Sequence, residues 1–360
     1  MPPETFDVAR FDLVGAIADA LEEFLDEQTE RLAPLGPDAA ALLAEARVTV
    51  SGGKRLRGRF CFWGFLAVRP DPTPAEVRAV VRAAAALEVL QASALVHDDL
   101  MDASDTRRGR PATHRAFEAR HREAGWTGDA EQYGAAAAIL LGDLLLSWAD
   151  ELLRRCGLPL PVVAPALDVF DHCRSEVVSG QFLDVSVQAR GRADVDEAMR
   201  VLRYKSAKYS VERPLHVGAA LAGGDAAHLR ALTDFGLPLG EAFQLRDDQL
   251  GVFGEPATTG KPAGDDLVEG KRTVLVALAL DALPPADAAV LDAALGSPLD
   301  AAEVERLRDL FRGSGAEAAV EDLIARLTAT ALDALAAARF PATATAALEA
   351  LAVAATRRTS

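Results

Sequence analysis

Acidic side chains gather at two places in the sequence where they could hold a metal ion. The first is the run HDDLMD at residues 97–102, which ends a long apolar stretch. At about 100° per residue, Asp98 and Asp102 fall one turn apart on one helix face, and Gln91 lies within about 20° of each. Carboxylates held this close repel one another unless a cation neutralises them, and oxygen ligands favour Mg²⁺. The pattern predicts a magnesium site at the end of a buried helix.

The second acidic group lies far downstream, in FQLRDDQLG at residues 243–251. Gln244, Asp247 and Asp248 share one face of a helix, because residues three and four positions apart are neighbours there. Either acidic group taken alone is also compatible with a solvated helix end. The basic residues found elsewhere in the chain favour a metal site instead.

Those basic residues occur in four segments, most of them beside glycine. The segments are GGKRLRG at 52–58, TRRGR at 106–110, YKSAKY at 204–209, and the stretch 259–272 with TGKPAGDD and GKR. Arg and Lys bind phosphate oxygens, and glycine lets the backbone approach a ligand closely. Metal-binding acids on one side and cations on the other suit a polyphosphate. The remaining positions are aliphatic, so the sequence predicts a lipid diphosphate as the ligand.

The overall composition excludes several other functions. The 360 residues hold 38 Lys and Arg against 54 Asp and Glu, and a net charge of −16 argues against nucleic acid and anionic lipid surfaces as partners. Three scattered cysteines are too few for a disulfide framework and fit a reducing compartment. No uncharged apolar run reaches the roughly 18 residues of a membrane span, and the N-terminus lacks a signal pattern. These features predict a cytoplasmic protein with no transmembrane segment.

Apolar residues recur at helical spacing along most of the chain. The segments are 14–35, 75–100, 133–156, 163–189, 195–221, 226–252, 273–282 and 316–337. Aromatic residues make up only 6% of the chain and β-branched residues rarely alternate, so strands are not expected. No break is long enough for a linker, which predicts one all-α domain over residues 1–360. Two polar connections, 103–134 and 254–272, are expected to lack regular structure and to act as lids.

These motifs follow one another in the order of a known enzyme family. The sequence resembles the trans-isoprenyl diphosphate synthases (polyprenyl synthetases), and most of all the geranylgeranyl diphosphate synthases, over a motif-bearing core of about residues 50–285. The matching motifs are GKRLR at 53–57, DDLMD with the following RR at 98–108, GQFLD at 180–184, KS at 205–206, QLRDD at 244–248 and the loop from Lys261 to Lys271. The resemblance implies a single-domain bundle of long helices around a deep central apolar cavity, the isoprenoid synthase type I fold. It also implies a homodimer.

The resemblance further implies what the charged residues bind. Asp98 and Asp102 would hold two Mg²⁺ ions and Asp247 a third, with Asp248 in support. The residues implied to bind the allylic diphosphate are Arg107, Lys205 and Lys261. The residues implied to bind isopentenyl diphosphate are Lys54, Arg57, Gln91 and Arg108. Lys271 would close over the site.

The implied reaction is a head-to-tail condensation. Diphosphate leaves the allylic substrate, and the double bond of isopentenyl diphosphate attacks the resulting carbocation. Dipoles from Gln244, Ser206 and the Lys205 carbonyl would steady that cation. The catalytic set implied by the resemblance is therefore Lys205, Ser206, Gln244, Arg107 and Lys261. Asp184 is a candidate for orienting Lys205.

Two positions depart from the family pattern. Gly251 stands at the last position of the second acidic motif, where the family usually has an Asp that acts mainly through water. Ser206 replaces the commoner Thr and keeps its hydroxyl. The change at Gly251 leaves open a non-catalytic regulatory subunit of a heteromeric prenyl synthase.

A class I terpene cyclase is a further alternative. Asp143, Ser147 and Glu151 have the spacing of a cyclase metal triad. The triad follows the first acidic motif by only about 40 residues, which is too early for a cyclase. A cyclase also has no use for a second set of diphosphate-binding cations.

Small residues before the first acidic motif bear on product length in this family. The fifth and fourth residues upstream of Asp98 are Ser93 and Ala94. A helical wheel places Ala94 within about 40° of Asp98, whereas the role of Ser93 rests on the resemblance alone. Leu90 and Leu87 would form the floor of the pocket. This pattern favours a geranylgeranyl (C20) product and leaves C15 and C25 or longer products open.

Overall fold

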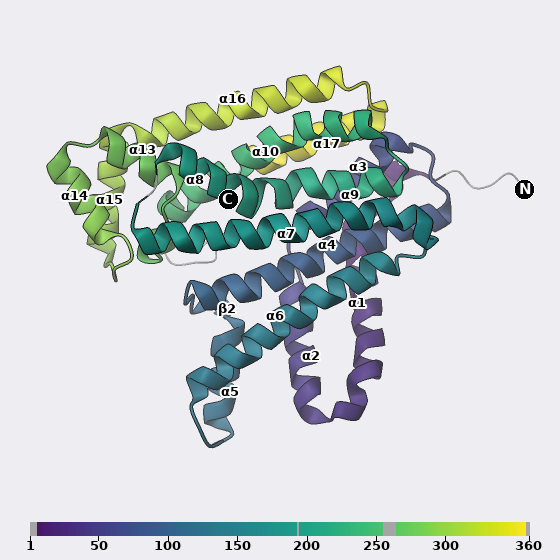
Figure 1. The fold of residues 1–360 in the computed structure, drawn as a ribbon, viewed down its shortest axis with the longest axis horizontal. Helices are drawn as coiled ribbons and strands as arrows, with labels where there is room; N and C mark the ends of the chain where they lie inside the picture. The colour runs from purple at the N-terminus through teal and green to yellow at the C-terminus, as the bar shows by residue number, and fades with distance from the viewer. Residues whose placement is uncertain (1–5, 193, 255–263, 358–360) are drawn as a thin grey trace, which may run out of the picture. The chain divides into compact units, whose positions relative to one another are not determined.

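The computed structural model describes residues 6–192, 194–254 and 264–357. These residues are almost entirely helical, with one two-stranded sheet among them (Figure 1). They divide into two compact units, Met1–Val169 with Pro214–Asp225 and Phe170–Arg213 with Ala226–Ser360. The predicted all-α class is confirmed, and the single domain stays a prediction.

The first unit is organised around one long buried helix. Its elements are η1 Val8–Arg10, α1 Leu13–Leu32, η2 Ala33–Leu35, α2 Pro37–Val50, α3 Leu56–Val68, α4 Pro74–Met101, β1 Thr106–Arg107, β2 Arg110–Pro111, α5 Thr113–Glu123, α6 Ala130–Arg154, the start of α7 (Leu160–Arg190), and α9 Arg213–Leu221. Helix α4 packs against α1, α3 and α6 (Figure 1). It therefore holds the end of the first acidic motif within the unit.

The sequence of α4 explains its length and its burial. Thr73 and Glu76 form a capping box before its first turn, where Pro74 supplies a preset backbone angle. Residues 83–86 are four alanines with no exposed surface, so neighbouring helices approach closely. By length and composition α4 could cross a membrane, but 78% of its most apolar window is buried, which is typical of a core helix. The helix ends at Met101, before Ala103 turns to a positive φ of 53°.

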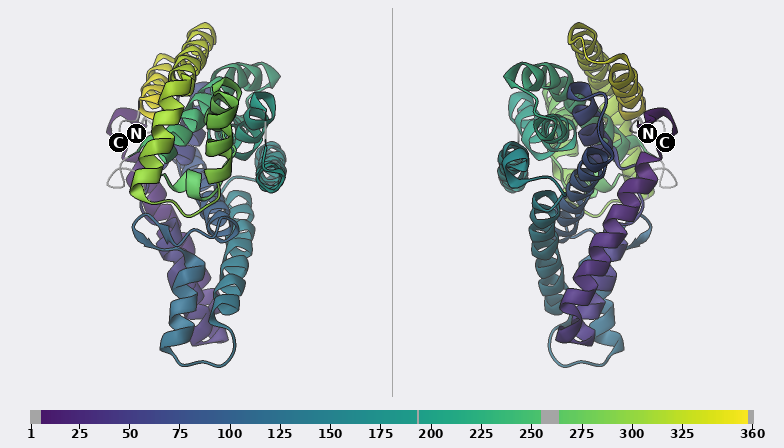
Figure 2. Two further views of the ribbon diagram at one scale, coloured as in Figure 1. Left: turned by 90° about the vertical axis from the view of Figure 1, so that its left-hand side faces the viewer. Right: turned by 90° about the vertical axis from the view of Figure 1, so that its right-hand side faces the viewer.

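The connection 103–134 has regular structure, and the expectation that it would lack any is wrong. It contains the β1–β2 hairpin and helix α5, which packs on α6. Figure 2 shows these blue-teal elements from two opposite sides. Helix α5 is amphipathic although its sequence is highly charged. Phe117 and Glu118 are buried, and Arg115 and Arg122 form ion pairs with Glu118.

The second unit holds its own apolar core. Its elements are the rest of α7, α8 Val195–Leu202, the π-helix η3 Arg203–Glu212, α10 Ala226–Phe253, α12 Asp265–Val268, α13 Val274–Ala282, α14 Pro285–Ala294, α15 Ala301–Ser314, α16 Ala316–Ala337 and α17 Ala342–Thr356. Helix α16 lies along α10 (Figure 1), and Leu245, Leu275, Phe311 and Val320 are fully buried in this core. Helix α12 corrects the second expected structureless connection, 254–272, within its described residues.

The π-helix interrupts what the sequence predicts as a single helix over 195–221. Its backbone bonds join residues five apart, so Lys208 and Arg213 lie on one face. Both bind Glu176 of α7, with Lys208 Nζ 2.8 Å from Oε1 and Arg213 Nε 2.7 Å from Oε2. Two glycines let the neighbouring helices come close. A Cβ on Gly180 would lie 2.5 Å from the Tyr204 carbonyl carbon, and one on Gly240 would lie 2.9 Å from that of Ala207.

Candidate active site

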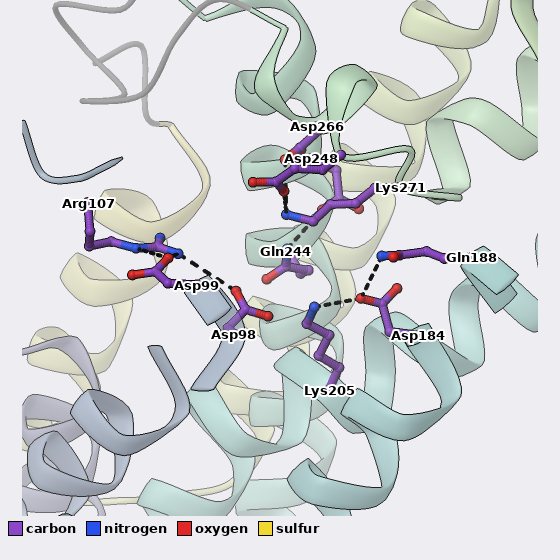
Figure 3. Close-up of polar contacts among 11 residues, drawn as sticks. Asp98, Asp99, Arg107, Asp184, Gln188, Lys205, Gln244, Asp248, Asp266 and Lys271 are labelled. Atoms are coloured by element: carbon purple, nitrogen blue, oxygen red, sulfur yellow. Dashed lines mark hydrogen bonds and ion pairs between the residues drawn. The ribbon is translucent and has the colours of Figure 1, made fainter. Parts of the chain in front are cut away.

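The first acidic motif occupies the last turn of α4. Asp98 and Asp102 lie one turn apart, as predicted, and the Asp102 amide donates to the Asp98 carbonyl at 2.8 Å. Asp99, for which the sequence predicts no role, is 3% exposed and faces the interior. Its carboxylate accepts a hydrogen bond from Arg107 Nε at 2.8 Å and another from Arg107 Nη2 (Figure 3). The sequence does hold a signal for this burial. Asp99 follows the apolar Val96 by three residues, so the two lie on the same side of α4, and Val96 is buried.

The β1–β2 hairpin sends two adjacent arginines in different directions. Arg108 and Gly109 have positive φ angles of 51° and 72°, the requirement of a tight two-residue hairpin turn. Arg107 lies in β1 and points to the acidic motif, where Nη2 is 3.7 Å from Asp98 Oδ2. Arg108 points elsewhere, and its Nη1 donates to the Ser51 carbonyl at 2.8 Å. The hairpin thus places one cation at each of two separate polar groups of the first unit.

A small polar cavity in the first unit receives Arg108. Its lining residues are Thr49, Val50, Arg55, Glu88, Gln91, Ala92, Leu95 and Arg108. Two residues predicted to bind isopentenyl diphosphate, Gln91 and Arg108, therefore come together. Burial lowers the pKa of Arg108, and the positive charges of Arg55 and Arg107 lower it further. Such a concentration of cations favours binding of an anion.

Arg55 belongs to the basic segment at 52–58, and no role for it is predicted from the sequence. It lies in the αL region at φ 50° and is buried, and its Nη1 donates to the Val50 carbonyl at 2.7 Å. Glu88 lies 3.7 Å from the same Nη1 and accepts a hydrogen bond from the Gly58 amide at 2.9 Å. These contacts fix the start of α3. Of the predicted residues nearby, Lys54 is exposed and Arg57 is half-buried.

In the second unit, the predicted pairing of Lys205 with Asp184 is present. Lys205 Nζ, on the π-helix, lies 2.6 Å from Asp184 Oδ2 on α7 (Figure 3). Gln188 Nε2 donates to the same oxygen at 3.4 Å. The close approach at Gly180 brings the Lys205 backbone up to α7, so the pair depends on that glycine. Ser206 follows Lys205 on the π-helix and is half-buried.

The second acidic motif lies on α10. Gln244 Nε2 donates to Asp248 Oδ1 at 2.8 Å, as the predicted shared face requires, and Asp247 is half-buried beside them. Burial raises the pKa of Asp248 to about 8, and the negative charge of Asp266 is the next largest cause (Figure 3). The positive charge of Lys271 offsets this shift only in part, so the motif could accept a further cation. Asp247 and Asp248 therefore fit a divalent metal ion.

Lys271 is held by acidic residues of its own segment. Its Nζ lies 3.3 Å from Asp266 Oδ1 and also pairs with Glu269. The sequence predicts no role for Asp266. Its neighbour on α10 is Gly251, and a glycine gives no sign in the sequence that a carboxylate lies against it. Lys261, the other predicted cation of this segment, lies outside the described residues.

The residues predicted to set product length divide into two kinds. Ser93 is 3% exposed, and its hydroxyl donates to the Gly142 carbonyl of α6 at 2.7 Å. Leu87 and Leu90 are fully buried within the first unit. Ala94 is half-buried and shares the face of Asp98. Ala94 is thus the member of this set that both lies on the face of the acidic motif and retains exposed surface.

The spacing that resembles a cyclase triad does not form a ligand set. Asp143 has a 66% exposed side chain near His97, and Ser147 donates to the Asp143 carbonyl at 2.9 Å. Glu151 pairs with Arg31 and Arg155. Within the described ranges, no group of three His, Cys, Asp or Glu side chains is arranged to hold a metal ion. Mg²⁺ commonly binds one or two carboxylates and takes its other ligands from water and substrate phosphates, so the acidic pairs fit it.

Comparison with known proteins now decides the family. Residues 40–312 match the family described as Polyprenyl synthetase. The chain belongs to this family. A polyprenyl synthetase is a prenyltransferase that makes isoprenyl diphosphates, and this family depends on divalent metal ions.

Individual relatives agree with this assignment. A solved structure of geranylgeranyl pyrophosphate synthase from Corynebacterium glutamicum, complexed with isoprenyl diphosphate and magnesium, is 42% identical with a TM-score of 0.93 and covers 96% of this chain and 98% of that one. A short chain isoprenyl diphosphate synthase of Methanothermobacter thermautotrophicus is 33% identical over 76% of this chain and 78% of its own. A geranylfarnesyl diphosphate synthase of Natronomonas pharaonis is 32% identical over 82% and 84%. The fold of this polyprenyl synthetase is the all-α prenyl synthase fold, and its relatives differ in the product they are named for.

Proposed function

We propose that this polyprenyl synthetase condenses isopentenyl diphosphate head to tail with an allylic diphosphate and releases geranylgeranyl diphosphate. The observation that carries the proposal is the division of Arg107 and Arg108 between two polar groups of the first unit. A chain-elongating synthase binds two diphosphates at once, whereas a cyclase binds one. The C20 product rests on the small side chain of Ala94 and on the buried leucines at 87 and 90.

The residues divide the work as follows. Asp98, Asp102 and Asp247 would hold three Mg²⁺ ions, with Asp248 in support. When bound, Mg²⁺ neutralises diphosphate and makes it a better leaving group. Arg107 and Lys205 supply positive charge where the allylic C–O bond breaks and its electron pair leaves with diphosphate.

The second half of the reaction forms the new carbon–carbon bond. The double bond of isopentenyl diphosphate donates its electron pair to the allylic carbocation, and a proton then passes from the new cation to the departed diphosphate. Arg108 and Gln91, with Lys54 and Arg57, hold isopentenyl diphosphate in place. Ser206 and Gln244 offer dipoles that stabilise the cation before the bond forms.

Product sizing tests this proposal directly. Purified protein would be incubated with Mg²⁺, labelled isopentenyl diphosphate and, separately, dimethylallyl, geranyl and farnesyl diphosphate. A C20 product supports the full proposal, and a C15 or C25 product keeps the reaction and corrects the pocket. A hydrocarbon formed without isopentenyl diphosphate would indicate a cyclase. No elongation from any starter would indicate a regulatory subunit.

We further propose that the enzyme works as a cytoplasmic homodimer. The net charge of −16 argues against nucleic acid and anionic lipid surfaces as partners, and three buried free cysteines among the described residues support a reducing compartment. Light scattering on the purified protein would give the mass of the assembly, and a monomer that elongates isoprenoids would contradict the dimer.

A further inference from the structure

Glu176 of α7 joins two residues of the π-helix segment that are also joined through the backbone. Its Oε1 accepts hydrogen bonds from Lys208 Nζ at 2.8 Å and from Arg213 Nη2 at 2.7 Å, and its Oε2 accepts one from Arg213 Nε at 2.7 Å. The Arg213 amide donates to the Lys208 carbonyl, which is the five-residue bond of a π-helix. These side-chain contacts, called here the Glu176 bridge, therefore span the same pair of residues as a π-type backbone bond.

The Glu176 bridge favours a π-helix over an α-helix. At about 100° per residue, two residues five apart in an α-helix point about 140° away from each other, so one carboxylate would reach only one of the two cations. The three side chains of the bridge are no more than 20% exposed. Removing one partner from such a group is costly, because it leaves a desolvated charge without a neutralising neighbour.

Glu176 is charged in this setting. Burial acts to raise the pKa of its carboxyl group, but the hydrogen bonds from Arg213 and Lys208 lower that pKa overall. The bridge therefore consists of a carboxylate between two cations, which is the form that gives the strongest hydrogen bonds.

The same face of α7 carries the partner of Lys205. Glu176, Gly180 and Asp184 follow one another at intervals of four residues, so they form one row along the helix. Asp184 accepts a hydrogen bond from Lys205 Nζ at 2.6 Å (Figure 3), and a side chain at Gly180 would collide with the Lys205 backbone. The row therefore holds the π-helix near its start at Lys205 and near its end through the Glu176 bridge.

Helix α10 holds the two ends of the π-helix. Arg203 is its first residue and donates from Nε to Glu241 Oε1 at 2.6 Å. Glu212 is its last residue and accepts a hydrogen bond from Thr233 Oγ1 at 3.0 Å. Without the Glu176 bridge the ends would stay attached, but the extra residue of the π-helix could move along the segment. The residues between the ends would then turn.

We propose that Glu176 is a positioning residue for Lys205, because it selects the π-helical arrangement in which the Lys205 ammonium group points to Asp184. The inference rests on the proposed function, which assigns Lys205 to the allylic diphosphate. Glu176 touches no substrate in this role and acts through the helix. Lys208, for which the sequence predicts no role, takes part in the same function as a member of the bridge.

The first test follows Lys205 directly in solution. The chain contains five lysines, so protein labelled with ¹³C at the lysine ε-carbons gives five NMR signals. The Lys205 and Lys208 signals would be assigned with Lys205→Arg and Lys208→Arg. We expect Glu176→Gln to move the Lys205 signal towards that of the exposed Lys54, whose own signal should stay unchanged.

Glu118→Gln is the matched control. Glu118 of α5 is also a buried carboxylate that pairs with two cations, Arg115 and Arg122. Its replacement should lower the thermal midpoint, as replacement of Glu176 does, and leave the Lys205 signal in place. Circular dichroism would show that each variant is folded.

A milder variant keeps the proposal testable where Glu176→Gln does not fold. Lys208→Gln removes one arm of the bridge, and Arg213 still neutralises Glu176. It should move the Lys205 signal in the same direction by a smaller amount.

Steady-state kinetics supplies a second readout. Glu176→Gln should raise the KM for the allylic diphosphate about tenfold and leave the KM for isopentenyl diphosphate unchanged, because the lost hydrogen bonds act through Lys205. Glu176→Asp, which keeps the charge, should recover part of the loss. The Glu118→Gln control should change neither KM.

Two results would overturn the proposal. One is folded Glu176→Gln protein whose Lys205 signal is that of the unaltered protein, and the other is an equal movement of this signal in Glu118→Gln. Equal rises in both KM values would also contradict it, since the effect is expected at Lys205 alone.

The proposed function is checked separately in the same preparations. If the unaltered protein elongates no substrate, but its Lys205 signal moves with Glu176→Gln, the synthase activity is refuted and the role of Glu176 stands. If the unaltered protein elongates normally and the Lys205 signal does not respond to Glu176, only the role of Glu176 is refuted.

Discussion

The carboxylate of Asp99 accepts two hydrogen bonds from the guanidinium of Arg107, one from Nε at 2.8 Å and one from Nη2. Asp99 is buried and lies in the middle of the first acidic motif, yet it faces away from the solvent side of α4. Of the three acids in this motif, Asp99 therefore holds Arg107 most directly, and Asp98 and Asp102 are the two that we propose as metal ligands.

Replacement of Asp99 by Asn should weaken both the fold and substrate binding. A hydrogen bond to a charged partner contributes about 1.5–3 kcal/mol, so we expect the free energy of unfolding to fall by about that amount. The KM for the allylic diphosphate should rise about tenfold while the KM for isopentenyl diphosphate stays unchanged. Urea denaturation and steady-state kinetics would measure the two effects. Asp105→Asn is the control, since its exposed pair with Arg115 contributes under about 1 kcal/mol.

The adjacent arginines of the hairpin should affect different substrates. Arg108→Gln removes a cation from the polar cavity and should raise the KM for isopentenyl diphosphate by about 10- to 100-fold. Arg107→Gln should raise the KM for the allylic substrate by a similar factor. Initial rates with one substrate varied at a time would separate the effects. Equal changes for both substrates in both variants would contradict two separate subsites.

The raised pKa of Asp248 predicts a definite pH dependence. Its pKa is about 8 in the metal-free folded protein against an ordinary 3.8, so the folded state holds a proton that the unfolded state releases. The resulting contribution to stability is complete below about pH 4 and is lost as the pH rises through about 8. Thermal midpoints of metal-free protein should therefore fall over this range, and Asp248→Asn should flatten the curve.

Metal affinity should change in the opposite direction. Because Mg²⁺ competes with the proton on Asp248, affinity at the second motif should rise as the pH increases towards about 8 and then level off. Calorimetric titration with Mg²⁺ and inorganic diphosphate at several pH values would show the trend. An affinity independent of pH between 6 and 8 would mean that Asp248 takes no part.

Ala94 and Ser93 should respond differently to a bulky side chain. Ala94→Phe keeps the fold, because Ala94 is half-buried on the face of Asp98, and it should shorten the product by at least one isoprene unit. Ser93→Phe should instead destabilise the protein by about 1–3 kcal/mol, since Ser93 is buried against Gly142. Product sizing would test the effect of Ala94→Phe, and thermal unfolding would test the effect of Ser93→Phe. An unchanged product from Ala94→Phe would remove this residue from the pocket wall.

The helices that the sequence predicted are those with a clear apolar period. All eight predicted segments contain helix, and the faces of Asp98–Asp102 and Gln244–Asp248 follow from helix geometry alone. Helix α3 was missed because it is apolar on nearly every side, which leaves no period to detect. Helix α5 was missed because its charges are paired only in the folded state.

Two site residues could not be assigned from sequence for a different reason. Asp99 is held by Arg107, and Asp266 lies against Gly251. Both partners lie beyond the reach of a helical wheel, because a turn or loop separates them from the acid. Such roles are set by tertiary contacts, which periodicity does not encode.

The π-helix at Arg203–Glu212 makes the length of this segment matter as much as its composition. Its bonds span five residues, so removing a single residue would let the segment return to the ordinary 3.6-residue repeat. That change would turn Lys205 by about 100° away from Asp184 and separate Lys208 from Arg213 on the helix surface. We therefore expect a one-residue deletion in this π-helix to be more harmful than most substitutions there, because it would break the contacts of Lys205 with Asp184 and of Lys208 with Glu176.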